Sequence, residues 1–309
     1  MANISAKDVA ELRKQTGIGM MECKKALVEA EGDFEAAIKL LREKGELKAA
    51  SKIANRIAAD GIVDIMKDGN LTAMIEVNSE TDFVAKNESF QEFVKNLLKT
   101  ILTAKPANVE ELMAAQYVEG GVTVDEKLKE EIFKIGEKLS IRRFALVEGL
   151  TETYIHGLGS IGVIAKFDTD CADKEGFAEF AKNIALQIGA YPTPYLTRND
   201  VPADVLESEK AIIKAQLAND PKMANKPEKV LDGIIVGKLG KFYEANCLVD
   251  MAYVKEDDMT VGQYVAKTAK ELGGNITIAS FCRFEKGEGI QKREEDFAAE
   301  IEKLAGGNK

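Results

Sequence analysis

The single histidine and a glycine-rich stretch beside it are the residues whose types and spacing most plainly suggest chemistry. His156 could act as an acid, a base or a metal ligand, but a lone histidine cannot build a His-rich metal site. The next six residues, GLGSIG (157–162), match the GxGxxG pattern of dinucleotide-binding loops. Such a loop follows a strand and opens a helix, whereas here VIAKF continues as a strand. We therefore expect a hairpin turn, with His156 as a turn residue.

The thiols and carboxylates form no reactive arrangement that the sequence reveals. Four cysteines, Cys23, Cys171, Cys247 and Cys282, lie far apart and form no CxxC pair, which predicts reduced thiols without disulfides or zinc. No GxxxxGK[ST] phosphate loop occurs, and no nucleophile–base arrangement can be recognised. The sequence thus favours a binding or regulatory protein over an enzyme, and predicts neither a cofactor nor a bound metal.

Charge and hydropathy narrow the class of partner. The formal net charge is −10, whereas binding to nucleic-acid phosphates relies on clustered lysine and arginine. No segment approaches the roughly 18 consecutive apolar residues of a membrane span, and the first residues have no apolar signal-peptide region. We expect a cytoplasmic chain that binds a protein or a small molecule, and neither nucleic acid nor a membrane.

An apolar ring in a polar segment is the main pointer to a binding surface. In NSETDFVAKNESF (78–90), between a predicted strand and a predicted helix, Phe83 follows Asp82 where a polar loop would favour Asn, Asp, Gly or Ser. Exposing a phenyl ring forgoes roughly 1.5–3 kcal/mol of burial. Either the ring packs beneath its own helix, or it is presented to a partner.

The same segment belongs to an internal repeat. Residues 60–83, DGIVDIMKDGNLTAMIEVNSETDF, are echoed by residues 148–171, EGLTETYIHGLGSIGVIAKFDTDC, and FQEFVKNLL is echoed by FAEFAKNIA. Both copies predict a β-hairpin, a loop and a helix. Aligned without gaps, the Thr-Asp turn is common to both copies, but Cys171 stands in the place of Phe83. A ring that one copy lacks is not required by the architecture, which favours a ring that faces a partner.

Glycines divide the first 45 residues into three predicted helices. AKDVAELRKQ has Ser5 as its cap, MMECKKALVEAE follows Gly19, and FEAAIKLLREK runs from a cap at Asp33 to Gly45. Met20, Cys23, Leu27 and Ala30 form an apolar stripe on the second helix, and Met21 lies outside it. Met21 either is exposed for binding or fills a gap in the core.

The second half of the chain predicts a pair of helices and a mixed carboxy-terminal end. ADVLESEKAIIKAQLAN and PEKVLDGIIVGKLGKFYEA are joined by a short proline-bearing link, which predicts an antiparallel helical hairpin. The expected elements after it are a strand (CLVDMAYVK), a helix (TVGQYVAKTAKEL), a strand (ITIASFCRF), a turn (EKGEG) and a last helix (EEDFAAEIEKLA).

Together these elements predict an α+β fold with a duplicated core of antiparallel sheets. We expect the following parts: an N-terminal three-helix domain plus linker (1–55), the first core half (56–145), the second core half (146–196 and 240–262), an inserted helical hairpin or coiled coil (197–239), and a C-terminal module (263–309).

Three motifs in collinear order resemble the bacterial elongation factor Ts family. They are TGIGMMECKKAL near the amino terminus, NSETDFVAKNESF in the first core half, and FCRFEKGEGIQKREEDFAAEI near the carboxy terminus. The resemblance extends over essentially the whole chain, although the segment VEGGVTVDEKLKEE matches none of the motifs.

The resemblance implies a guanine nucleotide exchange factor for elongation factor Tu, acting in the elongation step of protein synthesis. It implies an amino-terminal domain similar to ubiquitin-associated folds, and a last helix that returns to the GTPase domain of the partner. The implied contacts with that GTPase domain are Arg13, Met20, Met21 and Lys24, with Thr81, Asp82, Phe83 and Val84 dislocating its Mg²⁺, while His156 would contact another domain of the partner. A weak homodimer through the helical hairpin is a further expectation. The alternatives are a scaffold that binds another small GTPase, and a dinucleotide-binding enzyme that uses GLGSIG.

Overall fold

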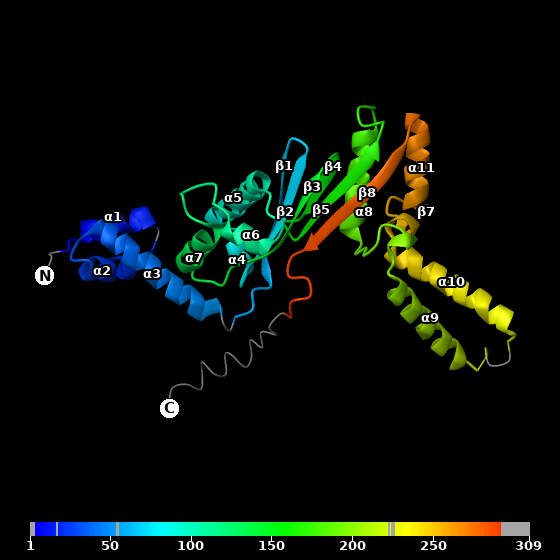
Figure 1. The fold of residues 1–309 in the computed structure, drawn as a ribbon, viewed down its shortest axis with the longest axis horizontal. Coiled ribbons are helices and arrows are strands. Elements are labelled where there is room, and N and C mark those ends of the chain that lie inside the picture. The colour runs from blue at the N-terminus through cyan, green and yellow to red at the C-terminus, as the bar shows by residue number, and fades with distance from the viewer. Residues whose placement is uncertain (1–3, 17, 54–55, 222, 224–225, 292–309) are drawn as a thin grey trace.

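The computed structural model describes residues 4–16, 18–53, 56–221, 223 and 226–291, and these form an α+β fold. Two three-stranded antiparallel sheets pack against each other at the centre. Figure 1 shows helices on the outer side of each sheet, and a pair of helices that projects from the second half. The predicted α+β class with antiparallel sheets is confirmed.

Three helices form the amino-terminal part, and their caps are those that the sequence predicts. They are α1 (Ala6–Thr16), α2 (Met20–Glu29) and α3 (Phe34–Ile53). Ser5 Oγ accepts a hydrogen bond from the Asp8 backbone N–H at 3.2 Å, and Asp33 Oδ1 accepts one from the Glu35 N–H at 2.9 Å. The buried core of this part consists of Val9, Leu12, Cys23, Ala26, Leu27, Ala37 and Leu41.

The third helix is longer than predicted. We expected it to end at Gly45, but α3 continues to Ile53. A single glycine inside a helix costs only about 1 kcal/mol relative to alanine, and most of the following residues, ELKAASK, are good helix formers. The predicted helix and the helical linker after it are therefore one continuous helix.

The first sheet and its helices enclose the largest core. The strands, in spatial order, are β1 (Asp60–Asp68), β2 (Leu71–Ser79) and β3 (Ser140–Glu148). The helices beside them are α5 (Glu88–Ala104), α6 (Val109–Ala114) and α7 (Val124–Ile135). Phe90, Phe93 and Leu97 of α5 are buried against the sheet. The segment VEGGVTVDEKLKEE supplies the turn before α7 and its first two turns, which a capping box of Thr123 and Glu126 begins.

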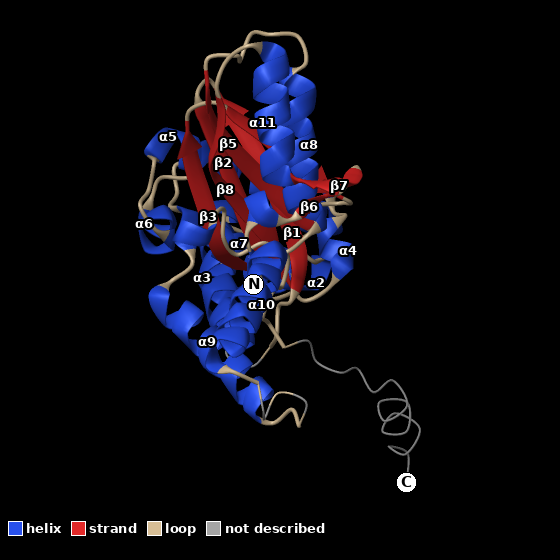
Figure 2. Ribbon diagram, turned by 90° about the vertical axis from the view of Figure 1, so that its right-hand side faces the viewer, coloured by secondary structure: helices blue, strands red, loops and turns tan. Residues whose placement is uncertain are grey.

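The second sheet takes its strands from two distant parts of the chain. In spatial order they are β4 (Thr151–His156), β5 (Ile161–Thr169) and β8 (Ile276–Glu285). The helices α8 (Phe177–Ala190) and α11 (Val261–Leu272) cover the outer face of this sheet, as Figure 2 shows. We predicted a strand at ITIASFCRF (276–284), but assigned it to a separate C-terminal module. It pairs along β5 instead and completes the second sheet.

The predicted strand CLVDMAYVK is wrong for most of its length. It forms a 3-10 turn, η2 (Leu248–Asp250), and then β6 (Ala252–Tyr253), which pairs with β7 (Glu256–Thr260). Leu248 and Met251 are nevertheless buried in the second core. A 3-10 turn places every third residue on one face, so apolar residues alone did not distinguish it from a strand.

Glycines allow the two sheets to approach closely. Gly159 O accepts a hydrogen bond from the Val63 N–H at 2.8 Å. A Cβ atom on Gly162 would lie only 2.5 Å from Val63 Cγ1. The GLGSIG stretch thus forms the turn between β4 and β5, as predicted, together with the first two residues of β5, and no helix begins there.

A helical hairpin projects from the second half, as predicted. It consists of α9 (Ala203–Ala218) and α10 (Glu228–Asn246), preceded by a 3-10 turn, η1 (Arg198–Asp200). At its base, Arg198 Nη2 lies 2.6 Å from Asp250 Oδ1, and the guanidinium lies 4.9 Å from the centroid of the Tyr243 ring. The last predicted helix, EEDFAAEIEKLA, lies outside the described residues.

The two halves correspond in space, but not by a gap-free alignment. Both β2 and β5 contain nine residues, and the pairing of each with its neighbour shifts register at the same place, between Glu76 and Val77 in β2 and between Lys166 and Phe167 in β5. The extra residues are Arg142 of β3 and Ala279 of β8. The β4–β5 turn is longer than the Gly69-Asn70 turn of the first hairpin, which shifts the correspondence after it.

The shifted correspondence corrects the expected match around Phe83. Because the ends of β2 and β5 coincide, Thr169 matches Ser79, and Cys171 matches Thr81 rather than Phe83. The gap-free alignment was wrong because it ignored the different turn lengths. The link after β5 contains no helix that corresponds to the segment carrying Phe83.

Candidate partner-binding site

The segment after β2 presents an aromatic ring to solvent. Thr81 is the N-cap of a one-turn helix, α4 (Asp82–Ala85), so the predicted polar loop is a short helix. Val84 and Ala85 are buried, whereas the Phe83 side chain is 76% exposed. The ring therefore does not pack beneath its own helix.

Lys86 lies against both exposed side chains of α4. Its ammonium pairs with the Asp82 carboxylate and lies 5.6 Å from the centroid of the Phe83 ring. The hydrogen bond from Lys86 holds the pKa of Asp82 below its ordinary value of 3.8. Asp82 is consequently ionised at neutral pH, and α4 presents an anion and a ring side by side.

Residues from the loop between α7 and β3 hold the start of α4. The backbone N–H of Thr81 donates to Glu137 Oε2 at 3.0 Å, and Thr81 Oγ1 donates to Glu137 Oε1 at 2.8 Å. Glu80 accepts a hydrogen bond from the Lys138 backbone N–H and pairs with Arg56 at 3.0 Å. The exposed ring is thus carried by a segment whose start is fixed by hydrogen bonds and an ion pair.

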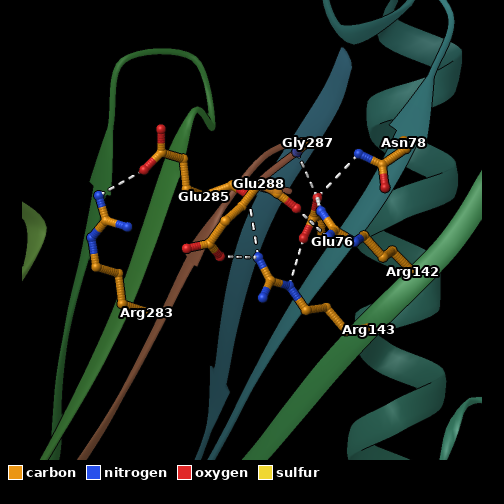
Figure 3. Close-up of polar contacts among 8 residues, drawn as sticks. All are labelled: Glu76, Asn78, Arg142, Arg143, Arg283, Glu285, Gly287 and Glu288. Carbon is orange, nitrogen blue, oxygen red and sulfur yellow. Dashed lines mark hydrogen bonds and ion pairs between the residues drawn. The ribbon is translucent and has the colours of Figure 1, made fainter. Parts of the chain in front are cut away.

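A buried carboxylate on β2 anchors the turn that follows β8. Glu76 is fully buried and accepts hydrogen bonds from Arg142 Nη1 at 2.9 Å and Arg143 Nε at 2.6 Å. The Gly287 N–H donates to it at 2.8 Å and Asn78 Nδ2 at 3.1 Å, as Figure 3 shows. Burial by itself would raise the pKa of Glu76, but these four donors outweigh it and hold the pKa below the ordinary value of 4.5. The carboxylate is ionised and serves as a structural anchor.

The same turn joins the β4–β5 hairpin to the end of the first sheet that carries α4. The Lys286 backbone N–H donates to Ser160 O at 3.0 Å, and its ammonium pairs with Asp60 at the start of β1. His156 lies at this end and is exposed, with the Tyr154 hydroxyl 2.8 Å from its Nδ1. Leu158 at the tip of the turn is 70% exposed. The structure thus brings His156 and α4 to the same end of the two sheets.

The predicted contact residues of the amino-terminal part are exposed. Met20 is 53% and Met21 66% exposed on α2, and Arg13 and Lys24 are also exposed. Our assignment of Met20 to the buried stripe was wrong, because Met20 is the first residue of α2 and lies beyond the core that Cys23 and the residues after it enter. Both thioethers are available to a partner.

Helix α7 connects the amino-terminal helices to α4. Phe133 packs against the core of the three helices, and Arg42 Nε lies 3.3 Å from Glu130 Oε1. The loop that follows α7 contains Glu137, which holds Thr81. Helix α7 and the loop after it therefore contact both parts of the chain that carry exposed candidate residues.

Among the described residues, no group of three or more His, Cys, Asp or Glu side chains is arranged to hold a metal ion. In the same part of the chain, no helix is both long and apolar enough to cross a membrane. The described cysteines are free thiols, and burial raises the pKa of Cys247 to about 11.

Comparison with known proteins identifies the family. A model of the family described as elongation factor TS matches residues 80–288. A protein named elongation factor Ts from Clostridium kluyveri is 46% identical over 306 residues, which cover 97% of this chain and 98% of that protein. The chain belongs to the elongation factor Ts family.

Two further relatives, also named elongation factor Ts, support the same family assignment. The protein from Trichlorobacter lovleyi is 45% identical over 312 residues, covering 98% of this chain and 99% of the relative. The protein from Syntrophotalea carbinolica is 42% identical over 301 residues, covering 96% of this chain and 98% of the relative. Members of this family are nucleotide exchange factors for elongation factor Tu, so the resemblance drawn from the three motifs is confirmed. An exchange factor is not a catalytic enzyme in the usual sense, and the dinucleotide-binding alternative is not favoured.

The sequence did not reveal three residues that shape this site. Leu158 could have been found, because an apolar residue in a glycine-rich turn is as unusual as Phe83 in a polar segment. Glu76 and Glu137 gave no local signal, since all their partners except Asn78 lie far away in the sequence. A charged residue at an alternating strand position predicts exposure, and only the sheet contacts reverse that expectation for Glu76.

Proposed function

We propose that the chain binds the GDP-bound form of elongation factor Tu and inserts Phe83, with Asp82 beside it, near the Mg²⁺ and phosphate site of the GTPase domain. The observation that carries the proposal is an exposed ring on a fixed one-turn helix, flanked by Thr81 and Val84. A phenyl ring held in water by a folded backbone gains its burial energy only when a partner covers it.

The proposed mechanism follows from how Mg²⁺ is bound. Mg²⁺ requires near-octahedral geometry at about 2.0–2.1 Å and keeps several waters, so a small shift of its surroundings is enough to lose it. Packed interfaces move between discrete arrangements, which a ring inserted between them can select. Loss of the ion leaves the phosphate charge less well neutralised, and nucleotide affinity falls. By linkage, the factor weakens nucleotide binding by the same free energy with which nucleotide weakens binding of the factor.

The remaining contacts are part of the same proposal. Arg13, Met20, Met21 and Lys24 would grip the GTPase domain, and His156 would contact a second domain of the partner. The five-part division of the chain, with β8 moved to the second core half, also remains a proposal. A cytoplasmic location and a weak homodimer through the α9–α10 hairpin are proposals as well. Support for the amino-terminal contact comes from the exposure of both methionines.

Stopped-flow release of labelled GDP from elongation factor Tu at several Mg²⁺ concentrations tests the mechanism. If the factor acts by dislocating the ion, EDTA-treated elongation factor Tu should release GDP at a rate that the factor hardly increases, because the ion is already absent. The factor should accelerate release strongly when Mg²⁺ is present. An equal acceleration with and without Mg²⁺ would contradict displacement of the ion.

A further inference from the structure

The ladder between β2 and β3 ends four residues before α4, and side chains continue it. The last paired residues are Asn78 and Ser140. At the next positions the Lys138 N–H donates to the Glu80 carboxylate, and the Thr81 N–H donates to the Glu137 carboxylate. Carboxylates thus replace backbone carbonyls as acceptors, which lets the chain turn away from the sheet without leaving these N–H groups unpaired.

The second half has a counterpart of the Lys138–Glu80 contact, but none of the Thr81–Glu137 contact. Its ladder ends at Thr169 and Ile276, and the Asn275 N–H donates to Asp170 Oδ1 at 2.7 Å, as Lys138 does to Glu80. At the following position Gly274 stands where the first half has Glu137, and a Cβ atom there would lie 2.3 Å from Cys171 Sγ. The Thr81–Glu137 contact therefore occurs in the half that carries the exposed ring, and the half without the ring has no room for it.

The contact acts on a short helix whose start is also held by a hydrogen bond from Ser79 Oγ to Thr81 O at 2.8 Å and by the contacts of Glu80 with Arg56 and Lys138. A four-residue helix is far below the length at which helices are stable on their own. Thr81 makes no side-chain capping bond to α4, and its hydroxyl donates to Glu137 instead. The Phe83 ring is exposed and lies against Lys86, and the backbone that carries it is held at Thr81 by two charge-assisted hydrogen bonds.

We propose that Glu137 is a positioning residue for nucleotide exchange, which holds Thr81 so that Phe83 is ordered before the partner arrives. The inference rests on the proposed role of Phe83. A ring that is already oriented loses less conformational freedom on binding, so more of its burial energy is available to shift the partner. Glu137 itself touches Thr81 and need not touch the partner.

A double-mutant cycle on the rate of GDP release from elongation factor Tu tests the proposal. We expect Glu137→Ala to slow release by about tenfold, the effect of losing a hydrogen bond to a charged group. Glu137→Gln should retain most activity, since its carbonyl accepts from the Thr81 N–H and its amide can donate to the hydroxyl. In a Phe83→Ala background, Glu137→Ala should have no further effect. Slowing of the same size in both backgrounds, or a normal rate for Glu137→Ala, would overturn the proposal.

A second measurement needs no partner. The chain has no tryptophan, so Phe83→Trp introduces a single indole whose fluorescence anisotropy reports the mobility of this position. Adding Glu137→Ala or Thr81→Val should lower the anisotropy in the folded protein, while Glu137→Gln should not. Asp170→Ala is a control, because it removes the carboxylate that corresponds to Glu80 from the half without the ring and should leave the indole unchanged.

The two measurements separate the two claims. If Phe83→Ala leaves GDP release unchanged, the proposed role of the ring fails, but the anisotropy still decides whether Glu137 orders it. If the ring matters and anisotropy is the same with and without Glu137, the positioning role is wrong.

Discussion

The two halves of the core share a sheet, a bulge and a covering helix, and differ in the link between strand and helix. In the first half this link contains α4, whose ring is exposed and whose start is fixed by Glu137. In the second half the corresponding link has no helix, and Cys171 is buried beside Gly274. The duplication thus gives both halves the same sheet and covering helix. The candidate site lies in the link between them, which differs between the halves.

A second difference lies just before the bulge. Glu76 in the first half is buried among four donors, while Lys166 at the corresponding position is half-buried. In the first half, Glu76 binds the turn after β8 through the Gly287 N–H. That turn also contacts the β4–β5 turn through Lys286. The halves are therefore joined by a buried ionic anchor as well as by apolar contacts between the sheets.

The largest expected effect is on stability, at the anchor. Glu76→Ala should lower the free energy of unfolding by about 3–5 kcal/mol, because two arginines and a buried N–H lose their acceptor. Lys166→Ala at the matched position should cost less than about 1 kcal/mol. Urea unfolding followed by circular dichroism measures both, and similar costs for the two variants would mean that the anchor is not special to the first half.

The next largest effect is expected on the rate of nucleotide exchange when the Phe83 ring is removed. Phe83→Ala should slow GDP release from elongation factor Tu by about 10- to 100-fold, since a desolvated aromatic contact can be worth several kcal/mol and 1.4 kcal/mol is a factor of ten. Its melting temperature should be nearly unchanged, because the ring is exposed. Leu158→Ala removes the comparable exposed residue of the second half and should mainly weaken binding. A large loss of melting temperature in Phe83→Ala with normal release would show that the ring is structural.

A smaller effect is expected on the acid side of the stability curve. The pKa of Glu76 is depressed in the folded state, so its contribution is complete above the ordinary value of 4.5 and is lost as the pH falls through the folded-state pKa. The difference in unfolding free energy between the unmodified protein and Glu76→Gln should therefore shrink as the pH is lowered from 7 to below 4.5. A difference that stays constant with pH would exclude an ionised anchor.

A moderate loss of affinity is expected from the amino-terminal helices. Met20→Ala with Met21→Ala should weaken complex formation while the protein remains folded, because both side chains are more than half exposed. Val236→Ala on the projecting hairpin is a control with similar exposure, and should leave affinity unchanged. Titration calorimetry with elongation factor Tu measures both variants, and normal binding by the double variant would mean that this contact has been misassigned.

The smallest effect is expected from removing the projecting hairpin. Replacing residues 207–241 by a short Gly-Ser link keeps the Arg198–Asp250 pair and Tyr243 at the base. The two sheets close without this segment, so most exchange activity should remain. Complete loss of exchange in a variant that still melts cooperatively would place an essential contact on the hairpin.

The sequence by itself determined the elements whose signals are local. Caps at Ser5 and Asp33, the turn at GLGSIG and the hairpin of helices were predicted correctly, because a cap or a turn depends on residues within a few positions of it. Unusual residue types at Phe83 and in the three motifs were also sufficient to indicate the family. These features require no knowledge of how distant segments pack.

Tertiary structure alone decided the features that depend on distant contacts. The pairing of β8 with β5, the burial of Glu76 and the shifted match of the two halves follow from sheet register, which one turn of different length changes. Glu137 meets Thr81 only because the β2–β3 ladder brings their segments together. The exposure of Phe83 was open in the sequence because a ring in a short helix can point inward or outward, and the burial of Val84 and Ala85 turns it outward.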